Sequence, residues 1–108
     1  MSDSGPHFEE MARRARAEVA AGSATIVDVR TDEEWQECHI PGALHWDIAR
    51  LEAGEFPDID KTRRVYVYCA AGGRAASAAD FLRSNGWTDV TNMGGLRDWE
   101  SIGGPVER

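Results

Sequence analysis

Apolar and polar residues alternate along the chain in blocks that predict helices and strands in turn. The first block, residues 6–20, carries apolar side chains at helical spacing, at Phe8, Met11, Ala12, Ala15 and Val19. Short runs rich in β-branched and aromatic residues predict strands at 25–30, 44–46, 65–68 and 89–93. Because helical segments separate these runs, the pattern predicts an α/β fold with a parallel sheet covered by helices on both faces.

The predicted helices have recognisable start and stop signals. Thr31 and Glu34 have the spacing of a capping box, and Asp47 is suited to cap the helix that follows the second strand. A longer helix runs from Ala75 and stops at Asn85-Gly86. These signals place a helix directly after the 65–68 strand.

The length of 108 residues fits one domain with a real core. We therefore expect a single domain over residues 1–108, with a core at about 7–103 and loose termini. Ser4 or Gly5 would cap the first helix, and the tail is expected to fray from Gly103.

Composition narrows the partners and the compartment. The formal net charge is -7, so we expect neither nucleic acid nor a membrane as a partner. No apolar run approaches the ~20 residues that a spanning helix needs, and the first ten residues lack the pattern of a secretory signal. Two cysteines do not make a disulfide framework, and the sequence favours a cytoplasmic location with reduced thiols.

The candidate chemistry centres on Cys69, which ends a predicted strand just before a helix. Gly72 and Gly73 allow the intervening turn to fold its N–H groups inward, toward an anion. The helix start is electropositive, and Arg74 adds a permanent positive charge. All three effects favour the thiolate, the nucleophilic form of cysteine. The alternative is a small buried cysteine that only packs.

Other polar residues are candidates for support of this loop. Asp28 and Arg30 flank a strand end, where open α/β sheets place their sites, and they could hold the loop or each other. Glu34 is interpreted first as a helix cap. His39 and His45 adjoin apolar residues without a zinc spacing, so we expect them to pack and expect no metal site.

Several fragments together resemble the rhodanese (sulfurtransferase) family. Each fragment is short, but their order and spacing match the family from about residue 7 to 103. The matching fragments are Asp28-Val29-Arg30, Glu34-Trp35, His39-Ile40-Pro41-Gly42-Ala43, Tyr68-Cys69-Ala70-Ala71-Gly72-Gly73-Arg74 and Gly94-Gly95-Leu96-Arg97-Asp98-Trp99.

The resemblance implies a three-layer α/β/α domain on a parallel sheet of about five strands. It makes Cys69 the catalytic residue, which would take a sulfane sulfur from thiosulfate or a persulfide and pass it to cyanide, a thiol or a protein acceptor. It implies no metal or organic cofactor, and from their place at the strand end we expect Asp28 and Arg30 to have a supporting role. It places the substrate against the loop residues Ala70, Ala71, Gly72, Gly73 and Arg74.

Loop length and composition refine this expectation. Phosphatases of similar fold use a longer loop, whereas four residues separate Cys69 from Arg74 here, which favours sulfur transfer. Ala70 and Ala71 stand where members specialised for thiosulfate often carry basic side chains. The alternatives are a module for sulfur delivery to, or sensing with, a protein partner, and a reductase that uses Cys69 with Cys38, which is otherwise a spare thiol.

Overall fold

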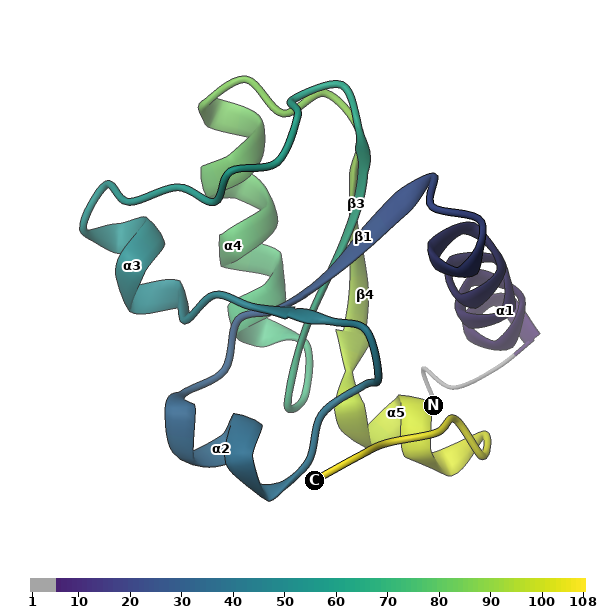
Figure 1. Cartoon of the computed structure of the whole chain (residues 1–108). Coiled ribbons are helices and arrows are strands. Elements are labelled where there is room, and N and C mark those ends of the chain that lie inside the picture. The colour runs from purple at the N-terminus through teal and green to yellow at the C-terminus, as the bar shows by residue number, and fades with distance from the viewer. Residues whose placement is uncertain (1–5) are drawn as a thin grey trace.

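The computed structural model describes residues 6–108, with side chains from Phe8 onward. The loose segment and the cap expected within residues 1–5 lie outside the described residues. Helices and strands alternate along the chain, as the hydrophobic pattern predicts (Figure 1). The elements are α1 (Pro6–Ala20), β1 (Ala24–Asp28), α2 (Asp32–Glu37), β2 (Leu44–His45), α3 (Ile48–Glu52), β3 (Arg64–Cys69), α4 (Gly73–Ser84), β4 (Val90–Gly95) and α5 (Leu96–Ser101).

The sheet is parallel throughout and has four strands among the described residues, in the order β2-β1-β3-β4. The expectation of about five strands, which rested on the family resemblance, is therefore corrected to four. The physical reason lies in the sequence, because only four runs carry the β-branched and aromatic residues that make a buried strand. β2 is the shortest of them and pairs with β1 through only two residue pairs.

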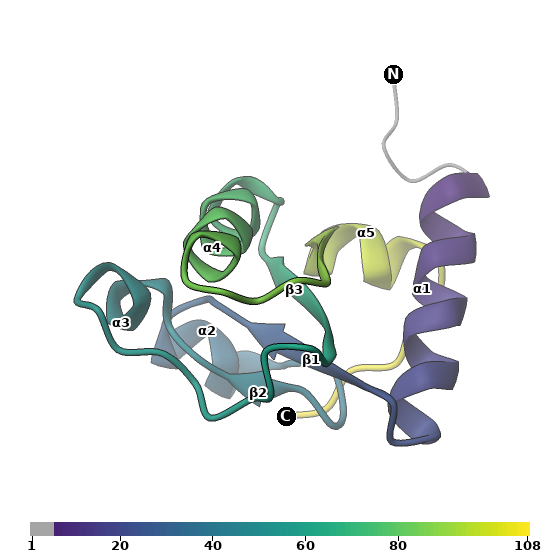
Figure 2. The ribbon, with the colours of Figure 1, turned by 90° about the horizontal axis from the view of Figure 1, so that it is seen from above.

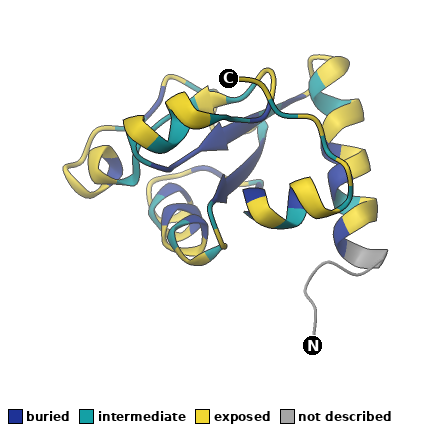
Figure 3. Ribbon diagram, turned by 90° about the horizontal axis from the view of Figure 1, so that it is seen from below, coloured by how far each residue is buried: buried dark blue, intermediate teal, exposed yellow. Residues whose placement is uncertain are grey.

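Two apolar clusters cover the two faces of the sheet, which gives three layers (Figure 2). One cluster joins alternate residues of β1 and β3 to α3 and α4, and the other joins the intervening residues to α1 and α5. Tyr66 and Tyr68 face one side of β3 while Val65 and Val67 face the other, as the two-residue period of a strand requires. The two central strands, β1 and β3, are accordingly buried along almost their whole length (Figure 3).

The carboxyl ends of the two central strands meet at one edge of the sheet. Asp28 pairs with Tyr68, so β1 ends beside the residue that precedes Cys69. The turn into α4 and the helix α2 lie at this same end of the molecule (Figure 1). Residues from separate parts of the chain therefore converge around the end of β3.

The C-terminal segment differs from the fraying tail that the sequence predicts. Glu107 and His39 exchange two backbone hydrogen bonds of 2.8 Å each, as an isolated antiparallel bridge. The indole Nε1 of Trp99, a residue only 1% exposed, donates to the Pro105 carbonyl at 2.8 Å. These bonds tie the tail to the turn after α2 and to α5, so the prediction of a loose C-terminus is wrong.

Candidate active site

Cys69 is the last residue of β3 and is 1% exposed. Its Sγ accepts a hydrogen bond from the backbone N–H of Gly72 at 2.9 Å and another from that of Ala75 at 3.3 Å. Gly72 reaches this position with a φ of 107°, a conformation that favours glycine. The turn thus directs two N–H groups at the sulfur, an arrangement that stabilises negative charge on it.

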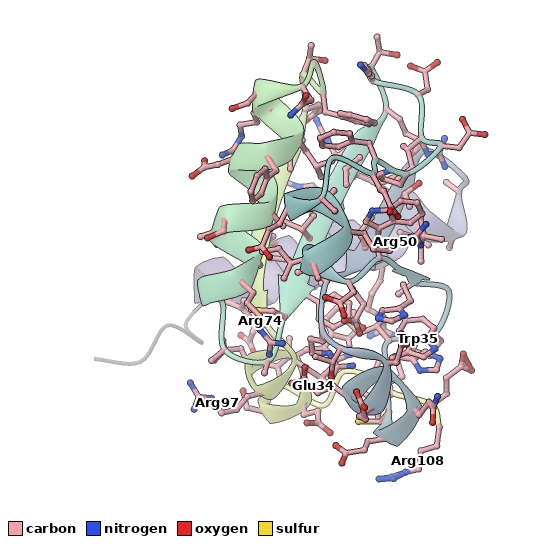
Figure 4. All side chains as sticks on the ribbon, turned by 90° about the vertical axis from the view of Figure 1, so that its left-hand side faces the viewer. Glu34, Trp35, Arg50, Arg74, Arg97 and Arg108 are labelled. Atoms are coloured by element: carbon pink, nitrogen blue, oxygen red, sulfur yellow. The ribbon has the colours of Figure 1, made fainter. Side chains whose placement is uncertain are left out.

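Arg74 lies at the edge of this loop but is held by a carboxylate. Its Nη1 and Nη2 donate to Oε1 and Oε2 of Glu34 at 2.7 and 3.0 Å, a two-point ion pair (Figure 4). The hydrogen bonds from Arg74, together with those from Thr31, lower the pKa of Glu34 to about 2. Glu34 also completes the predicted capping box of α2 with Thr31. The charge of Arg74 is therefore compensated within the protein.

Asp28 and Arg30 form a buried ion pair. Arg30 donates from Nε and Nη2 to the Asp28 carboxylate, with a shortest distance of 2.7 Å, and donates again to the Cys38 carbonyl at 2.6 Å. Asp28 is fully buried and Arg30 is 4% exposed. From the sequence, Asp28 and Arg30 could hold the loop or each other. In the structure the two side chains bind each other, and the pair fixes the segment after α2 against the strand ends.

Tyr68 extends this buried network on the other side of Asp28. Its hydroxyl oxygen accepts a hydrogen bond from the Ile40 N–H at 3.1 Å. Burial, and next the nearby Asp28 carboxylate, raise the pKa of Tyr68 above its ordinary value. The residue that directly precedes Cys69 is thereby neutral and fixed.

Gly95 is a site residue that the sequence analysis missed. A Cβ at this position would lie 2.7 Å from Cα of Ala71 and closer still to the Ala70 carbonyl. Its φ of -120° is open to any residue, so space rather than conformation requires glycine. The Arg97 N–H also donates to the Ala70 carbonyl, at 3.4 Å. The Cys69 loop therefore rests directly on the backbone between β4 and α5.

The two histidines stack on Trp35, as the expected packing role requires. The ring of His39 lies 3.5 Å from that of Trp35 and nearly parallel to it, and the ring of His45 lies 5.0 Å away. Each histidine also contacts a backbone carbonyl at 2.8 Å, that of Trp35 or Arg30. Within residues 6–108 no group of three or more His, Cys, Asp or Glu side chains is placed to hold a metal ion.

The two cysteines belong to different layers. Cys69 is part of the cluster beneath α3 and α4, whereas Cys38 packs against the cluster beneath α1 and α5. Both thiols are free.

In the described part of the chain, no helix has the length and apolar character needed to cross a membrane.

Known proteins are similar to this chain in architecture and in sequence. A family model described as "Rhodanese-like domain" matches residues 11–102. Thiosulfate sulfurtransferase PspE of Escherichia coli K12 is 37% identical over 75 residues, which cover 67% of this chain and 70% of PspE. Thiosulfate sulfurtransferase GlpE of Coxiella burnetii is 36% identical over 78 residues, which cover 70% of this chain and 71% of GlpE.

Solved structures agree with the sequence relatives. The Alr3790 protein of Anabaena superposes with a TM-score of 0.78 at 35% identity, covering 90% of this chain and 77% of that protein. Human single-domain sulfurtransferase TSTD1 gives 0.74 at 27% identity, covering 82% and 91%. Other relatives are longer, since the matched part is 42% of Bacillus subtilis YrkF and 60% of YqhL from the same organism.

The fold and the loop define an α/β protein that holds a cysteine sulfur against backbone N–H groups at the carboxyl edge of a parallel sheet. With the family model over most of its length, the chain belongs to the rhodanese family of sulfurtransferases.

Proposed function

We propose that the protein is an enzyme that moves a sulfane sulfur from thiosulfate or a persulfide donor to a thiophilic acceptor through a persulfide on Cys69. The observation that carries this proposal is the pair of N–H groups, from Gly72 and Ala75, that donate to Sγ. They favour the thiolate before transfer and require no side-chain base. PspE and GlpE, both named thiosulfate sulfurtransferases, support the reaction class.

In the first step the Cys69 thiolate attacks the outer sulfur of the donor. A new S–S bond forms to Sγ while the S–S bond of thiosulfate breaks, and its electron pair leaves with sulfite. The loop from Ala70 to Arg74 surrounds the transferred sulfur, which carries the negative charge of the persulfide. Its backbone N–H groups supply the stabilisation, because Ala70 and Ala71 have no polar side chain and Glu34 holds Arg74.

In the second step cyanide or a thiolate attacks the outer sulfur of the persulfide. The bond between the two sulfurs breaks, thiocyanate or a new persulfide leaves, and the electron pair returns to Cys69. Charge and electrons balance in both steps without a redox partner, which is consistent with our expectation of no cofactor. The two-step covalent route predicts ping-pong kinetics.

The size of the loop favours sulfur over phosphate as the transferred group. Four residues separate Cys69 from Arg74. The backbone of Gly95 lies against Ala70 and Ala71, so the loop has no space to move toward β4. A single sulfur needs less space than a tetrahedral phosphate with three free oxygens.

The test is the intact mass of the protein after incubation with thiosulfate and, separately, with glutathione persulfide. Formation of a persulfide adds one sulfur, about 32 Da, and later addition of cyanide removes it. Cys69→Ser should show no gain with either donor, because serine at this position is a poor nucleophile.

Circular dichroism of Cys69→Ser supplies the control for folding. Loss of transfer counts only when the variant retains the helix and strand signal of the wild type. A sulfur gain of equal size in Cys69→Ser would contradict the proposal, as would no gain in a folded wild type with a free thiol.

A second candidate is a module that delivers sulfur to a protein partner or senses it there, with little turnover on small donors. The ion pair that occupies Arg74 and the net charge of -7 favour this candidate, because both weaken attraction for a free dianion. Slow turnover of thiosulfate with fast loading from a persulfidated protein would support it.

Either activity needs reduced Cys69, so we place the protein in the cytoplasm.

A further inference from the structure

The Cys69 loop lacks a free positive charge of its own. Arg74 is engaged by both oxygens of Glu34, and Arg30 is enclosed by Asp28 and the Cys38 carbonyl. A small anionic donor that approaches Cys69 therefore meets no uncompensated cation within the loop. Because the chain has a net charge of -7, an unpaired cation beside the loop is important for attracting such a donor.

Arg97 is such a cation. Its backbone N–H donates to the Ala70 carbonyl at 3.4 Å, so residue 97 lies directly against the loop. Its side chain is exposed and makes no hydrogen bond or ion pair with any residue of the described chain. Figure 4 shows Arg97 at the same end of the molecule as Arg74, projecting outward from the ribbon.

We propose that Arg97 is the donor-binding cation of this site and makes Cys69 selective for small anionic sulfur donors such as thiosulfate. This inference rests on the proposed function and names its substrate class. Arg97 meets the outer, anionic end of the donor while the loop amides receive the sulfur that is transferred. The charge absent from Ala70 and Ala71 is thus supplied by a residue that lies far along the chain and beside the loop in space.

The effect is electrostatic and its size follows from the donor charge. Thiosulfate carries two negative charges, and one nearby cation at a solvent-exposed site changes its local concentration by about fivefold. A monoanion gains about twofold, and a neutral reagent gains nothing. The structure therefore predicts a charge dependence that a purely steric role of Arg97 does not produce.

The experiment compares two alkylating reagents of nearly equal shape, the anion iodoacetate and neutral iodoacetamide. Rates are measured at Cys69 in a Cys38→Ser background, so that only one thiol reacts. The thiolate fraction and the accessibility of Cys69 affect both reagents equally, so they drop out of the ratio of the two rates. Arg97→Gln should lower this ratio about twofold and slow sulfur loading from thiosulfate about fivefold, and Arg97→Lys should restore most of both.

Arg14→Gln is the matched control. Arg14 is exposed on α1, and the substitution makes the same change in net charge away from the loop. Equal ratios in Arg97→Gln and the parent would overturn the inference, as would an equal fall in Arg14→Gln. The alkylation ratio can be measured without turnover, so it tests the anion site separately from the proposed function. A lowered ratio in a protein that forms no persulfide would support the anion site and reject the proposed function. Persulfide formation at an unchanged rate in Arg97→Gln would support the proposed function and reject the anion site.

Discussion

Glu34 performs two tasks that are separable by substitution. It caps α2 through Thr31 and it neutralises Arg74 at the edge of the Cys69 loop. Glutamine can still cap a helix at this position, but it cannot pair as an anion with Arg74. The exchange of glutamate for glutamine thus isolates the ion pair between α2 and the loop.

We predict that Glu34→Gln destabilises the protein by about 1 kcal/mol at pH 7. The low pKa of Glu34 reflects a larger stabilisation of the carboxylate, but both side chains are about one third exposed and solvent screens the pair. The stabilisation is fully present above pH about 4.5, and it is lost as the pH falls through the folded-state pKa of about 2. Urea unfolding of both proteins at pH 7, 4 and 3 measures the difference in their free energies of unfolding, which should become smaller as the pH falls. A difference that stays constant would contradict the ion-pair origin.

The loop needs glycine at one position for space and tolerates alanine at another. Gly95→Ala would place a methyl group against Ala70 and Ala71, so we predict a loss of stability of about 1–3 kcal/mol and slower sulfur loading. Gly73 has open space around its Cβ position, and Gly73→Ala should be neutral or stabilise the protein by up to about 1 kcal/mol. Thermal melts together with loading rates test both, and the reverse order of stability would refute the close packing of the loop.

The residues of the site differ in how far the sequence predicts them. Cys69 and its glycines are predictable because strand, turn and helix signals adjoin one another within a few residues. The role of Gly95 and the pairing of Glu34 with Arg74 depend on contacts between distant segments. Hydrophobic periodicity carries no information about such contacts, so they emerge only from the fold.

At the scale of elements, order and type are predicted well, and strand ends are not. The run at 25–30 forms β1 only to Asp28, because the Arg30 side chain turns back to bind the Asp28 carboxylate. β3 and β4 each extend slightly beyond the predicted runs, as far as Cys69 and Gly95. The sequence does not predict the docking of the tail after α5, because the tail contributes backbone groups to these bonds and any sequence provides such groups.

This tail supplies the prediction at this scale. Deletion of residues 103–108 removes the bridge to His39 and the carbonyl partner of Trp99, and we predict a loss of about 1–3 kcal/mol in the free energy of unfolding. Deletion of Arg108 alone keeps these bonds and should change little. Urea midpoints of the two truncated proteins decide the matter, since equal midpoints would show that the tail adds no stability.

For the molecule as a whole, the sheet separates the two cysteines into different packing layers. We predict that Cys38→Ser leaves the rate of sulfur transfer within about twofold of the wild type, since the Cys38 thiol packs in the other layer and its bonds to Arg30 and Glu34 use only backbone groups. Steady-state kinetics with thiosulfate and cyanide provide the measurement. A large loss of turnover, with Cys69 still able to form its persulfide, would revive a reductase-like partnership of the two thiols.

The two amides that hold Sγ have a spectroscopic consequence. When a sulfur is added, the negative charge moves outward by one S–S bond, about 2 Å, away from the N–H groups of Gly72 and Ala75. Their proton and nitrogen resonances should then shift together, while amides near the tip of the loop respond to the newly arrived charge. Nuclear magnetic resonance of the isotopically labelled protein can therefore follow loading and unloading in real time, with the backbone itself as the indicator.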